Sequence, residues 1–183
     1  MTEATSAPSV DRVGPWSAEH LDDAGRAACG WTSVGTRGSG AIARVDRAGL
    51  VSPIGSGWSL DWWVGADDRW HLPSAETAVR QGIVDAAPVV ETRTRVPGGD
   101  IVERVYAAQG PATIDSRPVV VVEHTNETPV PVALAVSVRP QMPSGDGEIH
   151  DIVPVEDVGV TVDGAWSVLA DRPPRRVAAG GGG

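Results

Sequence analysis

The residue types best suited to chemistry gather in one stretch of the chain, residues 45–74. It holds Trp58, Trp62, Trp63, Trp70, Asp46, Asp61, Asp67, Asp68, Arg69 and His71. Indole faces stack on the apolar faces of sugar rings, while carboxylates and arginine hydrogen-bond to neighbouring sugar hydroxyls. This composition predicts an oligosaccharide contact made by Trp62, Trp63, Asp61, Trp70, Asp67 and Arg69.

A structural explanation of the same tryptophans competes with this prediction. Large aromatic side chains are most often core residues, so Trp58, Trp62 and Trp70 would then fill the gap between two sheets. Exposure distinguishes the two explanations, because a sugar-binding surface needs coplanar indoles that are open to solvent.

Catalytic use of this stretch has weaker support. Glycoside hydrolysis needs two carboxyl groups about 5 to 9.5 Å apart, for which Asp61 with Asp67 or Asp68 is the candidate pair. Asp67 and Asp68 followed by Arg69 are more typical of a polar turn with a local ion pair, so we expect no catalytic residue. His71 lacks the ligand spacing of a metal site, and we expect it to be a hydrogen-bonded structural residue, with no metal or cofactor.

Other motifs also favour structural explanations. No Gly-x-Ser-x-Gly elbow occurs, and Cys29 has no nucleophile motif around it. Asn126, at the start of a glycosylation sequon, is better explained as part of a turn. Glu123 and His124 are predicted to lie on a solvated strand edge.

The elements that position these residues are strands. From residue 41 onward the apolar residues alternate with period two between short Gly-, Pro-, Asp- and Asn-rich breaks, which predicts an all-β fold, an antiparallel β-sandwich of supersandwich-like type with little helix. Strands are expected over residues 79–84, 89–96, 101–106, 119–125, 130–138, 158–162 and 165–169.

Several hairpins follow from these strands. Residues 85–88 separate 79–84 from 89–96, residues 97–100 form a tight turn into 101–106, and Asp163-Gly164, between residues 158–162 and 165–169, is the strongest short hairpin signal. Residues 119–138 are interpreted as a further hairpin, and its two apolar strands are expected to be central in a sheet because both of their faces are partly apolar.

The predicted domain organisation has three parts. Residues 1–37 form a flexible N-terminal segment with a short helix over residues 17–30, residues 38–179 form the sandwich, and residues 180–183 form a disordered glycine tail. Because the glycine tail follows a strand-like stretch, we expect the chain to be a fragment of a longer protein.

Composition excludes several classes of function. The formal net charge of −9 and the scattered arginines argue against nucleic-acid binding. A single cysteine and the lack of a signal-peptide pattern predict a cytoplasmic protein, and no apolar run is long enough for a membrane span. All 15 basic residues are arginine and phenylalanine is absent, as in proteins of a GC-rich bacterium.

Two stretches resemble a known domain: VDRAGLVSPIGSGWSLDWWVGADDRWHLP, over residues 45–73, and VVVVEHTNETPVPVALAVSVRP, over residues 119–140. They are similar to the N-terminal β-sandwich domain that precedes the (α/α)6 catalytic barrel of bacterial glucoamylase-like and glycogen-debranching-like glycoside hydrolases. Ser59-Leu60-Asp61-Trp62 matches the Ser-Ile-Asp-Trp-like motif of that group, whereas the doubled Trp62-Trp63 departs from it.

The resemblance implies a sandwich that packs on a helical barrel and lends a loop to the rim of its sugar site. The acid and base carboxylates of the group lie in the barrel and have no counterpart here, so Trp62, Trp63 and Asp61 would be interface or subsite-rim residues. The predicted function is a non-catalytic domain of a carbohydrate-active enzyme. Its partners would be an oligosaccharide and a helical catalytic domain, in the same parent chain or separate; the alternative is a free-standing carbohydrate-binding or protein-interaction sandwich.

Overall fold

The structure is a computed structural model that describes residues 30–37, 40–85, 87–110, 117–155 and 158–178. These residues form fifteen strands, all paired antiparallel, and within these ranges there is no helix. The predicted all-β antiparallel fold is therefore confirmed. The predicted helix over residues 17–30 lies outside the described residues except for Gly30. No described helix could span a membrane.

One sheet has six strands, in the order β1-β2-β3-β4-β10, with β5 also paired to β4. The bounds are β1 Thr32–Thr36, β2 Gly40–Val45, β3 Val51–Pro53, β4 Ser59–Gly65, β5 Trp70–His71 and β10 Ala133–Arg139. The sheet thus begins before residue 38. β10 pairs with β4 along its whole length, from Ala133 opposite Gly65 to Arg139 opposite Ser59.

The second sheet is a meander of four strands in sequence order, β6-β7-β8-β9. The bounds are β6 Val79–Ile83, β7 Val89–Val96, β8 Gly99–Gln109 and β9 Pro118–Asn126. Pro97 and Gly98 alone connect β7 to β8, and Gly98 has a φ of 89°, which glycine adopts without steric cost. The strands predicted on either side of this turn are confirmed.

Two small sheets complete the described fold. Their bounds are β11 Gln141–Met142, β12 Gly145–Asp146, β13 Ile152–Val155, β14 Gly159–Val162 and β15 Ala165–Leu169. Asp163 and Gly164 have φ values of 50° and 76°, as a two-residue turn with two left-handed positions requires. The hairpin predicted at Asp163-Gly164 is confirmed.

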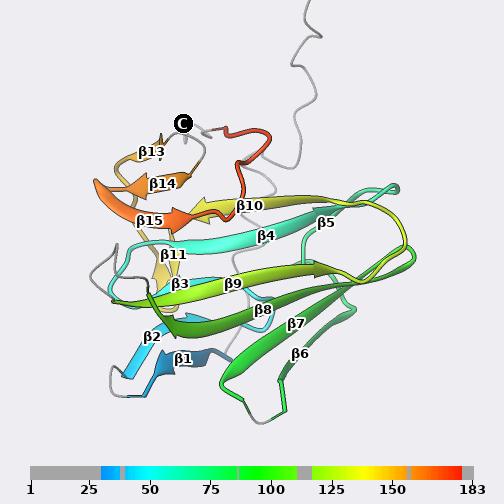
Figure 1. Cartoon of the computed structure of the whole chain (residues 1–183), viewed down its shortest axis with the longest axis horizontal. Coiled ribbons are helices and arrows are strands. Elements are labelled where there is room, and N and C mark those ends of the chain that lie inside the picture. Colours follow the sequence, from blue (N-terminus) through cyan, green and yellow to red (C-terminus); the bar gives the residue numbers. More distant parts are fainter. Residues whose placement is uncertain (1–29, 38–39, 86, 111–116, 156–157, 179–183) are drawn as a thin grey trace, which may run out of the picture.

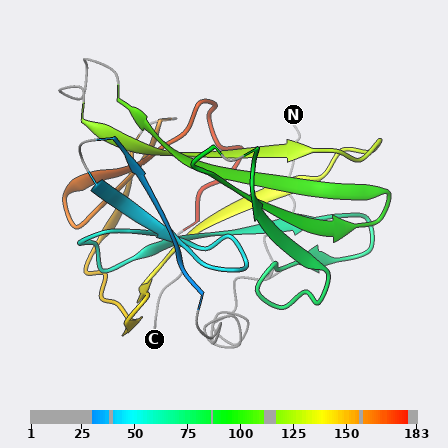
Figure 2. The ribbon, with the colours of Figure 1, turned by 90° about the horizontal axis from the view of Figure 1, so that it is seen from below.

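The two large sheets pack face to face, as the green and the blue-to-cyan layers of Figure 2 show. Near β1 to β3 the buried core joins Val34, Ala43, Val45 and Val51 of the six-stranded sheet to Val90 and Val105 of the four-stranded sheet. A second core cluster joins Trp62 and Val64 of β4 to Val96 and Ile101. Alternate residues of β4 therefore point into the sandwich.

The predicted hairpin over residues 119–138 is wrong. β9 pairs with β8 and β10 pairs with β4, so the connection between them crosses from one sheet to the other (Figure 1). Asn126 shapes this crossing, since its Oδ1 accepts the Thr128 N–H at 2.9 Å and its Nδ2 donates to the Val130 carbonyl at 2.7 Å.

The prediction that β9 and β10 are central strands is also wrong, because each ends its sheet in the described strand order. Apolar residues on both faces of a strand indicate what covers its faces. They do not reveal whether a neighbour pairs with its edge.

Candidate functional site

β4 carries three of the predicted sugar contacts and buries all three. Asp61 is 3% exposed, and Trp62 and Trp63 are each 1% exposed. Asp61 Oδ2 accepts hydrogen bonds from Arg139 Nη1 at 2.7 Å and Trp63 Nε1 at 3.3 Å, and its Oδ1 accepts the Trp62 backbone N–H at 2.8 Å. This carboxylate is therefore committed to bonds within the domain.

The other three predicted contacts lie around the β4–β5 turn. Asp67 and Arg69 are exposed, and Trp70 is half-buried. Arg69 donates to Glu76 through Nη1 at 2.5 Å and Nη2 at 3.2 Å, and to the Trp70 carbonyl at 3.2 Å. The six predicted residues thus divide between buried positions on the two faces of β4 and the partly exposed β4–β5 turn.

His71 is held between two carboxylates of the same loop. It is 3% exposed, with Nδ1 3.1 Å from Glu76 Oε1 and Nε2 3.0 Å from Asp68 Oδ1. The His71 hydrogen bond lowers the pKa of Asp68, and the Arg69 hydrogen bond lowers that of Glu76. The predicted hydrogen bonding of His71 and the predicted local ion pair, here between Asp68 and Arg69 at 3.9 Å, are confirmed. Among the described residues, no three His, Cys, Asp or Glu side chains are grouped to hold a metal.

A buried polar cluster that the sequence analysis did not predict lies between the sheets. Glu103 of β8 is 1% exposed, and its Oε1 lies 3.6 Å from Nε2 of His124 on β9. The His124 ring packs on Trp62, with centroids 5.0 Å apart and planes tilted by 55°. The solvated edge predicted for Glu123 and His124 holds for Glu123 but is wrong for His124, whose side chain is only 12% exposed.

Burial perturbs the titration of both ionisable groups in this cluster. It raises the pKa of Glu103 well above its usual range; the carboxylates of Asp61 and Asp46 raise it further, and the nearby Trp62 N–H offsets part of the rise. Burial also lowers the pKa of His124 to about 4. Burial therefore favours the uncharged form of both side chains inside the sandwich.

Alternation along β8 is the signal that could have found Glu103. Ile101, Glu103 and Val105 point to the same face, and Ile101 and Val105 are core residues. His124 follows Val120 and Val122 on β9 with the same period, and both valines pack on the core.

A groove of about 3410 Å³ opens along β9 and β10. Its walls include all of residues 117–125 and 131–147, together with Trp31, Trp58, Trp63 and Trp70 and part of the segment that ends at Ala178. The valines of β9, Val119 to Val122, are all half-buried there. A groove of this size and composition is suited to an extended protein surface.

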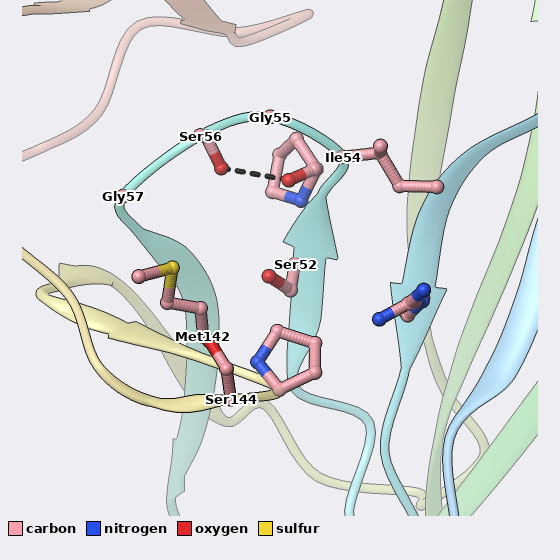
Figure 3. Close-up of a pocket in the computed structure, with 10 residues that line it drawn as sticks. Ser52, Ile54, Gly55, Ser56, Gly57, Met142 and Ser144 are labelled. Atoms are coloured by element: carbon pink, nitrogen blue, oxygen red, sulfur yellow. Dashed lines mark hydrogen bonds between the residues drawn. The ribbon is translucent and has the colours of Figure 1, made fainter.

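A smaller hollow of about 430 Å³ lies between residues 52–57 and the turn at residues 142–144. Figure 3 shows Ser52, Ser56 and Ser144 around it, with Ser56 Oγ 2.8 Å from the Pro53 carbonyl oxygen. Its walls include neither a histidine nor a carboxylate, so they supply no general base to activate a serine.

Comparisons with protein-family models, curated proteins and solved structures find no match to this chain. The resemblance of residues 45–73 and 119–140 to a glycoside hydrolase domain therefore stays a prediction.

Proposed function

We propose that this chain is a non-catalytic β-sandwich domain of a carbohydrate-active enzyme that packs, through the groove, on a catalytic domain of glycoside hydrolase type. The observation that carries the proposal is the exposure of Leu134 and Val136, at 44% and 45%, on the core-facing side of β10. Apolar side chains on such a face are normally covered, which supports a partner surface in the groove.

The state of the predicted sugar contacts supports packing over sugar binding. Trp62 and Trp63 present almost no surface to solvent, and Asp61 is bonded to Arg139. The enzyme part of the proposal rests on the resemblance of residues 45–73 and 119–140 to the glycoside hydrolase domain.

A free-standing sugar-binding sandwich is the second candidate. Trp31, Trp58 and Trp70 are half-buried and line the groove, so a sugar could reach them. Titration of the chain with maltooligosaccharides, followed by tryptophan fluorescence, separates the two candidates. A saturable shift in emission supports sugar binding, and an unchanged spectrum supports packing.

The mass and activity of the native protein test the proposal directly. An antibody against this domain recovers the protein from its source cells, and the mass and glucan hydrolysis of the recovered material are measured. We expect a polypeptide or complex far heavier than 19.0 kDa that hydrolyses glucans, while the purified 183-residue chain does not. A lone 19.0 kDa species, or a heavier one without glycoside hydrolase activity, would overturn the proposal.

A further inference from the structure

The ring contact between His124 and Trp62 shows which strands face each other at one end of β9. His124 belongs to β9 and Trp62 to β4, so this end of β9 lies over β4, whereas Val120 and Val122 pack on the core cluster of β1 to β3. β10 is the next strand after β4 in the six-stranded sheet. The position over β10, beside β9, is therefore where a further strand of the four-stranded sheet would lie.

No described strand occupies this position. Leu134 and Val136 lie opposite Val64 and Trp62 in the β4–β10 register and so share their core-facing side. Val64 and Trp62 are 0% and 1% exposed, whereas Leu134 and Val136 are 44% and 45% exposed. On the core-facing side of the sheet, these side chains of β4 are thus buried, whereas those of β10 are open to solvent.

The outer edge of β9 is unprotected. Among the described residues β9 pairs only with β8, so alternate backbone N–H and C=O groups on its other edge lack strand partners. Pro118 begins the strand and the exposed Glu123 follows the valines, but the run from Val119 to Val122 between them carries neither a charge nor a proline to guard the edge. Only an extended segment satisfies such an edge and covers the face beside it.

The charge of the groove restricts what this segment carries. Charges of both signs line the groove, where Glu123, Asp146, Asp151 and Asp171 lie with five arginines. Arg172 pairs with Asp171 and Arg139 with Asp61, whereas no ion pair joins Arg175 or Arg176 to another described residue. These two arginines favour acidic side chains on the segment that lies against them. A second copy of the chain fits poorly, because its net charge is also −9.

We propose that an extended segment of the partner protein pairs with the outer edge of β9 as a fifth strand of that sheet. Its apolar side chains cover Leu134 and Val136, and its acidic side chains face Arg175 and Arg176. The identity of the partner as the catalytic domain rests on the proposed function, whereas the pairing mode rests on β9 and β10.

Hydrogen–deuterium exchange tests the pairing. Exchange of the β9 amides that face away from β8 is measured in the native protein, recovered with its partner, and in the purified 183-residue chain. We expect exchange at least about 100-fold slower with the partner, because these amides gain hydrogen bonds that open only with the sheet.

A matched pair of substitutions in the native protein gives the control. Val136 and Val153 are both 45% exposed, but only Val136 lines the groove. Val136→Asp puts a charge under the added strand and should abolish the slow exchange of β9, whereas Val153→Asp should leave it unchanged. Equal effects of the two substitutions would contradict the proposal.

The remaining outcomes identify other occupants and overturn the pairing. Slow exchange of β9 in the purified chain that disappears on removal of residues 1–29 would assign the edge to that segment, and slow exchange that disappears on dilution would assign it to a second copy. Fast exchange of β9 in a native protein heavier than 19.0 kDa would reject the pairing while the proposed function stands. A native protein of 19.0 kDa would instead reject the proposed function itself.

Discussion

Asp61, which the sequence predicts to contact a sugar, instead forms an ion pair with Arg139 inside the domain. Both side chains are almost fully buried, and Arg139 Nη1 lies 2.7 Å from Asp61 Oδ2. Removing one partner from a buried ion pair leaves the other charge without compensation, which is more costly than removing both.

Arg139→Met should therefore lower the free energy of unfolding by about 4 kcal/mol. The double variant Asp61→Leu with Arg139→Met should lose less, because no unpaired charge remains buried. Urea denaturation measures both. As a control, Arg95→Met, which breaks a pair with Asp100 from a side chain that is 61% exposed, should cost less than about 1 kcal/mol. Similar losses for Arg139→Met and Arg95→Met would show that the buried ion pair contributes no more to the free energy of unfolding than the exposed one.

Glu103 predicts a dependence of stability on pH. Its pKa is raised in the folded state, so the folded protein holds a proton that the unfolded chain releases above about 4.5. The contribution of Glu103 is complete below that pH and is lost as the pH rises through the folded pKa. His124 acts in the opposite sense, with a folded pKa of about 4 against the ordinary 6.5, so its contribution is lost as the pH falls between these values.

Glu103→Gln should remove the loss of folding stability that Glu103 causes as the pH rises, because the amide does not ionise. Relative to wild type, the variant should gain stability progressively from pH 5 to pH 9 in urea denaturation curves. The comparison at each pH cancels the His124 contribution that both proteins share. A difference between the two proteins that does not change with pH would contradict the assignment of a raised pKa to Glu103.

At the scale of elements, the backbone of the loop between β2 and β3 packs against the buried polar cluster of Glu103, His124 and Trp62. Asp46 Oδ1 accepts the backbone N–H groups of Ala48 and Leu50, both at 2.8 Å, and so holds the turn closed. Gly49 has a φ of 91°, and a Cβ there would collide with the Glu103 carboxylate and lie 2.6 Å from Trp62 Nε1.

Gly49→Ala should therefore lower the free energy of unfolding by about 3 kcal/mol through backbone strain and overpacking. Gly82→Ala on β6 is the control, since no heavy atom lies within 4 Å of its added Cβ, and it should change stability by less than about 0.5 kcal/mol. Thermal unfolding ranks the two variants. Equal melting temperatures would mean that the loop yields to the added methyl group.

The elements that could be predicted from sequence are those specified by neighbouring residues. Asp163 and Gly164 determine their hairpin locally, and the alternation around Glu103 identifies one strand face correctly. The pairing of β9 and β10 could not be predicted, because valines on both faces describe burial and not the partner at the edge. The Glu103 cluster was missed for a related reason: its members come from β4, β8, β9 and the loop at Gly49, which only the packed sheets bring together.

At the scale of the whole molecule, the groove leaves apolar surface open in the chain by itself. The purified chain should bind a hydrophobic dye under native conditions, mainly at Leu134 and Val136. Replacing both with Lys should remove most of the dye fluorescence. Ile54→Lys, at a side chain that is 50% exposed outside this groove, should remove little. Equal losses would mean that the dye binds across the surface without preference for the groove.

The crossing between β9 and β10 also orders events during synthesis. Among the described strands, each member of the four-stranded meander pairs only with its neighbours in the chain, so this sheet can form once residue 126 has left the ribosome. The ion pair of Asp61 with Arg139 spans 78 residues, and at roughly 5 to 20 residues per second the ribosome delivers Arg139 several seconds after Asp61. During that interval the edge of β4 that pairs with β10 has no strand partner, and a chaperone that binds this edge would act in this period.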